Sequence, residues 1–250
     1  MKKITFCLLL LLAIGCEKKE KLTFETMTLT NEGCSDCPAM VIKIPKVLSE
    51  NKVAQTINTA LREEIIYSLS FEDENDASDI EGAMDSFTAE YHKMKSEFPD
   101  MASLSEWEAE IKAEVIYEDK SLVTIQLNGY TYTGGAHGYG YTTYLNFDKD
   151  KGEELDNWQL FKDLEGFTTL AETKFRSEQD IPKNGDINTT GFMFEKNQFH
   201  LADNIGFTPE GLQMVYNQYE VASYADGPIL LTISFDEANP FLKKTFQPKL

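Results

Sequence analysis

The stretch Thr131–Tyr141, TYTGGAHGYGY, has the residue types in this chain that are best suited to binding chemistry. Its glycines permit positive φ angles and close backbone approach, so a loop here can project a histidine between tyrosines. We therefore take five residues as candidate ligand-binding residues: Gly134, Gly135, His137, Tyr139 and Tyr141. The alternative interpretation is a glycine-rich connection between strands whose histidine bonds a neighbouring carbonyl group.

Catalysis at His137 would require an acidic partner within hydrogen-bond reach. The sequence cannot show which acid, if any, approaches this histidine. It contains no G-x-S-x-G nucleophile motif, and His92, His137 and His200 are isolated from one another rather than paired at metal-ligand spacing. We expect no metal and no cofactor, and we expect a binding protein in preference to an enzyme.

The N-terminus reads as a bacterial lipoprotein signal. Lys2 and Lys3 precede an apolar run from Ile4 to Ile14 that is too short for a permanent membrane span, and Gly15 precedes Cys16. We expect cleavage before Cys16, acylation of its thiol, and a body tethered to a membrane outside the cytoplasm. The expected location is the outer membrane or cell surface rather than the inner membrane. An ordinary secretory signal cut elsewhere is the alternative, because Ala13 departs from the usual lipobox.

Two further cysteines, Cys34 and Cys37, are the only thiols left once Cys7 leaves with the signal and Cys16 is acylated. Outside the cytoplasm this C-x-x-C spacing predicts a disulfide that closes a tight turn. A redox-active pair is less well supported, because catalytic C-x-x-C motifs begin a helix and the residues after Pro38 are typical of a strand. A zinc site would need two more ligands.

Charge narrows the range of partners. The chain has 23 basic and 42 acidic residues and a formal net charge of −19, and loss of two signal lysines lowers it to −21. Such a surface repels phosphate backbones and anionic headgroups, which excludes nucleic acid and leaves the acyl anchor as the route to the membrane. It attracts basic proteins. The alternative is that acidity only keeps an exported protein soluble.

Hydrophobic periodicity predicts an α+β protein, with helices packed on antiparallel sheets. The first helix is expected to follow an N-cap at Ser49 and to run to Leu69. Two more helices are expected at 80–98 and 164–178. Strands are expected at 22–30, 40–44, 107–117, 122–133, 139–147, 192–194, 199–201, 212–216 and 229–235. The acidic turn after Phe147 resembles the opening of a calcium loop but lacks its spacing, which favours a hairpin turn.

The segment TYTGGAHGYGYTTYLNFDKDKGEELDNWQLFKD and the later YEVASYADGP and ILLTISF resemble a known extracytoplasmic family of unknown function. That domain occurs in the lysozyme-sensing anti-sigma factor RsiV and beside the catalytic domain of the peptidoglycan deacetylase PdaC. The preceding half resembles its deacetylase-associated companion domain. The implied organisation is a signal peptide at 1–15, a tether at 16–21, a PdaC-like domain at 22–133 and an RsiV-like domain at 134–250.

The resemblance implies a non-catalytic binding or sensing module at the cell envelope. The deacetylase reaction belongs to a separate catalytic domain whose metal ligands, an aspartate and an H-x-x-x-H pair, are missing here. By analogy, the expected partner is a basic, cleft-bearing protein such as lysozyme, or a peptidoglycan-related ligand. Two alternatives stay open: an envelope glycan-processing hydrolase that uses His137, and a passive envelope scaffold that makes contacts through exposed tyrosines.

Overall fold

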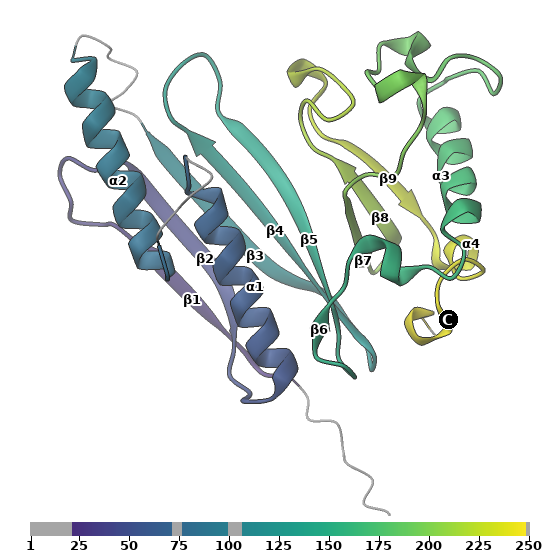
Figure 1. Ribbon diagram of the computed structural model, residues 1–250, viewed down its shortest axis with the longest axis horizontal. Helices are drawn as coiled ribbons and strands as arrows, with labels where there is room; N and C mark the ends of the chain where they lie inside the picture. The colour runs from purple at the N-terminus through teal and green to yellow at the C-terminus, as the bar shows by residue number, and fades with distance from the viewer. Residues whose placement is uncertain (1–21, 72–76, 100–106, 249–250) are drawn as a thin grey trace, which may run out of the picture.

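The computed structural model describes residues 22–71, 77–99 and 107–248, and it confirms the expected α+β class. The expected signal peptide, Cys16 and the expected tether lie outside the described residues. Within the described residues two sheets form, one of six strands and one of three (Figure 1). The six strands follow chain order from edge to edge: β1 (Phe24–Thr30), β2 (Ala39–Val47), β3 (Glu108–Glu118), β4 (Leu122–Tyr132), β5 (Tyr139–Asp148) and β6 (Glu153–Glu154).

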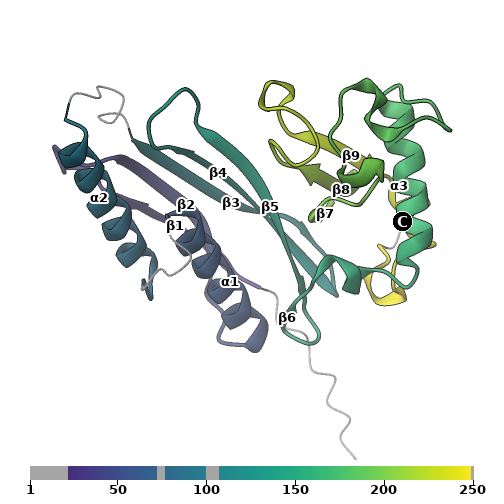
Figure 2. The ribbon, with the colours of Figure 1, turned by 45° about the horizontal axis from the view of Figure 1, so that its top comes forward.

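Helices α1 (Lys52–Ser68) and α2 (Ile80–Glu97) cover one face of the six-stranded sheet (Figure 2). The α1 helix begins after Asn51, whose side chain accepts a hydrogen bond from the Ala54 amide at 3.0 Å, two residues later than expected. Strands β2 and β3 pair in parallel, and the two helices form the long crossover that such a pair requires, whereas every other pair in the sheet is antiparallel.

Strand β3 shows why the sequence periodicity was informative. Ala109, Ile111 and Ala113 are buried beneath the helices, and the charged residues between them, Glu110 and Lys112, are exposed. Strand β4 lacks this alternation because both of its faces are covered. Val123 belongs to the helix-side core, whereas its neighbour Leu122 belongs to the core of the second sheet.

The expected disulfide between Cys34 and Cys37 is present in the turn between β1 and β2, with Cα atoms 5.6 Å apart. Asn31 closes the same turn, because its side-chain oxygen accepts a hydrogen bond from the Met40 amide at 3.0 Å. The hairpin with a bridged tip that the sequence predicted is therefore confirmed.

The second core surrounds the three-stranded sheet, which is packed by α3 (Leu164–Glu178) and the short α4 (Phe235–Ala238). Its strands are β7 (Asn204–Thr208), β8 (Gly211–Tyr216) and β9 (Ile229–Ile233). Single-turn 3-10 helices complete this part of the chain: η2 (Asn157–Leu160), η3 (Ile187–Thr190), η4 (Glu195–Asn197), η5 (Tyr224–Asp226) and η6 (Lys244–Phe246).

The strands expected at 192–194 and 199–201 were wrong. These segments flank η4 and direct aromatic rings at α3, where Phe194 and Phe199 lie 5.3 and 5.6 Å from the Phe175 ring. Burial of the rings, rather than strand pairing, accounts for the apolar residues there. The acidic turn after β5 is the expected hairpin turn, and the Asp148 carboxylate accepts hydrogen bonds from the backbone amides of residues 150 and 151.

The second sheet is joined to the first along the outer edge of β5. The Asn217 side chain accepts a hydrogen bond from the Thr142 amide at 2.8 Å and donates one to the Thr142 carbonyl at 3.1 Å. Asn146 on β5 donates to the Ile205 carbonyl at 2.7 Å. The two bonds of Asn217 cover a strand edge that would otherwise attract other chains. The division expected between residues 133 and 134 falls inside the β4–β5 hairpin, so β5 and β6 share a sheet with the N-terminal half.

Candidate functional site

The glycine-rich loop joins β4 to β5 and carries His137 at the surface. Gly134 and Gly135 both have φ of +93°, a conformation that favours glycine. The Tyr132 hydroxyl donates to the Gly135 carbonyl at 2.9 Å, which holds the turn. The exposed His137 ring stacks on Tyr224 of η5, with ring centres 4.5 Å apart and planes inclined by 23°.

A second loop, residues 217–228, supplies the other half of this contact. Tyr219 lies 5.7 Å from Tyr224 between ring centres and has 60% of its surface exposed. We call His137, Tyr219 and Tyr224 the aromatic loop cluster. The cluster is assembled from both halves of the chain, because the loop that carries its tyrosines follows β8 and bonds the edge of β5 through Asn217.

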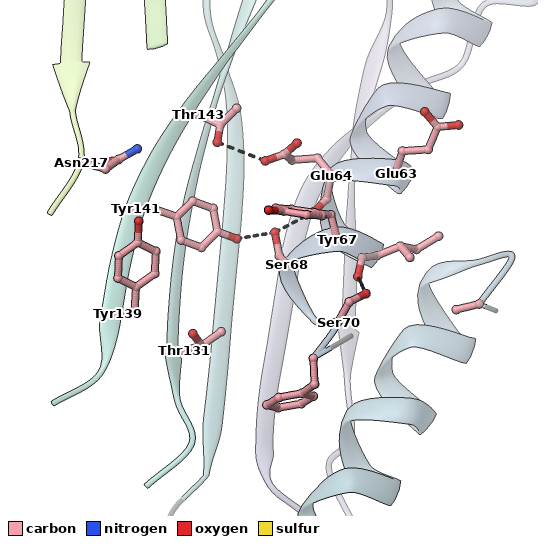
Figure 3. Close-up of a pocket in the computed structure, with 13 residues that line it drawn as sticks. Glu63, Glu64, Tyr67, Ser68, Ser70, Thr131, Tyr139, Tyr141, Thr143 and Asn217 are labelled. Carbon is pink, nitrogen blue, oxygen red and sulfur yellow. Dashed lines mark hydrogen bonds between the residues drawn. The ribbon is translucent and has the colours of Figure 1, made fainter. Parts of the chain in front are cut away.

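The remaining predicted residues, Tyr139 and Tyr141, lie on the β5 face that looks toward α1. Their rings are stacked with centres 6.0 Å apart. They line a cavity of about 710 Å³ between α1 and β5, and Figure 3 shows the side chains that surround it. We call it the α1–β5 groove. The residues that determine its chemistry are Glu63, Glu64, Tyr67, Tyr139, Tyr141 and Thr143.

Hydrogen bonds fix the walls of the groove (Figure 3). The Tyr141 hydroxyl donates to the Ser68 hydroxyl, and the Thr143 hydroxyl donates to the Glu64 carboxylate at 3.1 Å. Tyr141 also depends on Gly129 of β4: a Cβ atom at position 129 would lie 2.0 Å from the tyrosine ring. Glycine at this position leaves the ring room to lie across the neighbouring strand.

The groove is acidic and partly shielded from water. Burial raises the pKa of the Glu64 carboxyl, against the hydrogen bond from Thr143, which acts in the opposite direction. Burial also raises the pKa of Tyr141 to about 12, and its neighbours Glu64 and Tyr139 act in the same direction. No lysine, arginine or histidine occurs among the described residues that line the groove.

The structure therefore divides the five predicted ligand-binding residues between two places. Gly134, Gly135 and His137 form the exposed loop, whereas Tyr139 and Tyr141 line the groove. His137 is not among the described residues that line the groove. Within the described ranges no group of three or more histidine, cysteine, aspartate or glutamate side chains is arranged to hold a metal ion.

Sequence reasoning missed the partners on other elements. Tyr224 lies in the quoted YEVASYADGP segment but had no signal that linked it to His137. Glu64 and Tyr67 look like ordinary surface residues of an amphipathic helix. Their three-residue spacing places both on one side of α1, but only the fold shows that this side meets β5.

Comparisons with known proteins identify two domain families in this chain. Residues 32–139 match the family model described as deacetylase PdaC, and residues 150–236 match the model of a protein family of unknown function, DUF3298. The chain thus combines a PdaC domain with a DUF3298 domain, in agreement with the resemblance seen in its motifs. No curated protein matches the sequence.

Two solved structures share the fold over most of their length. A DUF3298 family member from Bacteroides fragilis NCTC 9343 is 21% identical with a TM-score of 0.70, and the alignment covers 91% of this chain and 96% of that one. A DUF3298 family protein from Pseudomonas aeruginosa PAO1 is 20% identical with a TM-score of 0.64, over 93% of this chain and 99% of that one. The paired arrangement of the two halves is therefore a fold that these proteins share.

Proposed function

We propose that this protein is a lipid-anchored binding module of the cell envelope that captures a basic protein through the aromatic loop cluster. The observation that carries the proposal is the stacking of exposed His137 on Tyr224, which joins loops from the two halves into one surface feature. Aromatic side chains that are rigidly presented and partly exposed are typical anchors of protein interfaces.

Binding accounts for this geometry better than catalysis does. A hydrolase that used His137 would need it in a pocket beside a carboxylate, but the ring is exposed and stacked on a tyrosine. Burial raises the pKa of Glu64, but this carboxylate lies in the α1–β5 groove, which His137 does not line. A loop that projects a ring from a fixed scaffold suits entry into the cleft of a partner.

Charge supports the choice of a basic partner. Without its signal the chain has a formal net charge of −21. The negative electrostatic potential that this charge produces accelerates the encounter with a cationic protein and makes the association sensitive to salt. Lysozyme is a basic, cleft-bearing protein, so it is the partner we propose to test first.

The anchor is proposed from the signal sequence alone. Acylation of Cys16, six residues before buried Leu22, would hold the protein at a membrane surface, and we propose that this is the outer membrane or cell surface. Among the described residues, no helix is both long and apolar enough to cross a bilayer. Mass spectrometry of the envelope fraction should find a triacylated N-terminal cysteine, and an unmodified N-terminus would reject the anchor.

The binding proposal predicts that lysozyme binds the purified mature protein and that His137→Ala weakens the complex at least tenfold, because the ring is a central contact. Calorimetric titration at low ionic strength measures both affinities. Tyr224→Ala should have a comparable effect. The matched control is His92→Ala, since His92 is an exposed histidine on α2 that belongs to neither loop. Absence of lysozyme binding, or equal effects of the His92 and His137 variants, would reject the proposal.

A further inference from the structure

The α1–β5 groove is a formed cavity separate from the aromatic loop cluster. Its volume of about 710 Å³ lies within the range of small-molecule sites, roughly 300–1,000 Å³. One wall is α1 and the other is β5, and both are held by the core beneath them. The cavity therefore exists before any ligand arrives.

The charges in the groove are of one sign. Glu63 and Glu64 are the ionisable acids that line it, and none of its described lining residues is cationic. Glu63 forms an ion pair with Arg62 at 3.6 Å, between side chains that are both well exposed. The Glu64 carboxylate accepts a hydrogen bond from the neutral Thr143 hydroxyl, so that contact leaves its charge uncompensated.

Burial of this carboxylate costs free energy that a cationic ligand would recover. Burial is the largest influence on Glu64, and it raises the pKa of the carboxyl. An opposite charge placed within hydrogen-bond distance would reverse that effect, and charge-assisted bonds of this kind are stronger than neutral ones. A negative charge at the same position would repel the Glu64 carboxylate and raise its pKa further.

The aromatic rings provide the second element of recognition. Tyr139 and Tyr141 are stacked on β5, and Tyr67 stands on α1 on the opposite side of the groove (Figure 3). Tyrosine faces attract guanidinium and ammonium groups through the ring quadrupole. A carboxylate flanked by tyrosine rings is thus suited to a cation that carries apolar atoms, rather than to a bare metal ion.

From this arrangement we infer that the α1–β5 groove is a binding site for an organic cation, a guanidinium or alkylammonium group that pairs with Glu64 and packs against Tyr139 and Tyr141. The cation has two natural sources: an arginine or lysine side chain of a bound protein, or a free small amine. The inference stands on the groove itself and does not depend on lysozyme being the partner of the aromatic loop cluster.

The test compares argininamide with citrulline amide, both acetylated at the α-amino group so that the guanidinium is the one charge that distinguishes them. Citrulline amide has the same shape but a neutral urea group. Titration calorimetry of the purified mature protein should detect argininamide and show binding at least tenfold weaker for citrulline amide. Glu64→Gln, which keeps the side-chain shape, should weaken argininamide at least tenfold. Glu165→Gln is the control, because Glu165 is an exposed acid in the first turn of α3.

Several outcomes would overturn the inference. Equal affinity for the two amides would show that charge is not recognised, and an unchanged affinity in Glu64→Gln would place the site elsewhere. Binding of a neutral chitin trisaccharide without binding of argininamide would assign the groove to glycans. Thermal melting of each variant checks that it folds, and Tyr141→Phe provides a second variant that retains the ring while removing the bond to Ser68.

The two sources are separated by competition. If a protein side chain occupies the groove, argininamide should reduce lysozyme affinity, and Glu64→Gln should do the same. If the natural ligand is a free amine, lysozyme affinity should be unchanged in both experiments while argininamide still binds. Failure of lysozyme to bind at all would reject the proposed function, yet the amide comparison would still test the groove.

Discussion

Tyr144 illustrates how single side chains join the two halves. Its ring is buried at the point where β5 meets the second sheet, and its hydroxyl donates to the Gln213 side chain at 2.6 Å. Burial raises the pKa of Tyr144 to about 12, partly offset by the hydrogen bond from Gln126. The folded state thus favours the neutral phenol.

This pKa has a consequence for stability at alkaline pH. Because the folded pKa lies above the ordinary value of about 10, the stabilisation is complete below pH 10 and is lost as the pH rises toward 12. The Tyr144→Phe variant has no phenol at this position to ionise. Its free energy of unfolding should therefore fall less over this interval than that of the wild type, by about 2–3 kcal/mol. Urea unfolding at several pH values measures the difference.

The matched control for this experiment is Tyr67→Phe, whose side chain is 79% exposed. Its stability should follow the wild-type curve throughout. If Tyr144→Phe also followed the wild-type curve between pH 10 and 12, Tyr144 would not be the buried phenol that couples ionisation to unfolding.

Individual residues were predictable where their chemistry is local. Gly134 and Gly135 take the positive φ angles that the motif suggested, and Cys34 bonds Cys37, because a short turn decides both. The contacts of His137 and Tyr141 were not predictable, because their partners Tyr224 and Ser68 lie 87 and 73 residues away in the chain. No local pattern encodes which distant ring or hydroxyl will be adjacent.

At the scale of elements, helices were the best predicted. The helix expected at 164–178 coincides with α3, and the apolar positions of α1 and α2 face the sheet as their spacing indicated. A helix carries its periodicity over several turns, so one misplaced cap changes its start by only a residue or two. The start of α1 at Lys52 is such a case.

Short strands were predicted less reliably, because their pairing is decided by other parts of the chain. The five residues of β7 were missed, and the aromatic segments on either side of η4 were mistaken for strands. The parallel pairing of β2 with β3 also escaped prediction. It depends on the direction in which the two-helix crossover returns the chain to the sheet, which is a property of the tertiary structure.

The bridged turn between β1 and β2 provides a test at this scale. In the loop-entropy model a disulfide that closes so short a loop stabilises the fold by about 2 kcal/mol. Replacing both cysteines, Cys34→Ser with Cys37→Ser, should lower the free energy of unfolding by that amount in urea titrations. Addition of a reductant to the wild type should produce the same change, and the double variant should be insensitive to it.

An unchanged stability in the double variant would mean that Asn31, whose side chain also bonds across this turn, is sufficient to hold it. A loss much larger than 4 kcal/mol would indicate that the cysteines support more than the turn. Either result would revise the role of the disulfide without affecting the site.

At the scale of the whole molecule, two hydrophobic cores share one sheet. The helix-side core and the second core meet across β4. Asn217, which follows β8, bonds the edge of β5, and Asn146 on β5 bonds the backbone of β7. This junction brings the glycine-rich loop beside the loop that carries Tyr219 and Tyr224. The candidate recognition surface exists only because the halves are joined here.

The position of β5 between the two halves made the domain boundary hard to place. The motif resemblance divided the chain at residues 133 and 134, and the family models match 32–139 and 150–236. Strand β5 (Tyr139–Asp148) lies almost entirely between those matches and pairs with β4 throughout. A shared strand has no sequence signal for the half to which it belongs, because Leu145 and Phe147 pack into the helix-side core while Asn146 bonds the second sheet.

The measurement that tests the central claim most directly is hydrogen exchange of the mature protein with and without bound lysozyme. If the aromatic loop cluster is the recognition surface, amides in residues 132–141 and 217–228 should exchange more slowly in the complex, and those of α3 should be unchanged. Slowed exchange confined to other segments, or none anywhere in the presence of saturating lysozyme, would contradict the account.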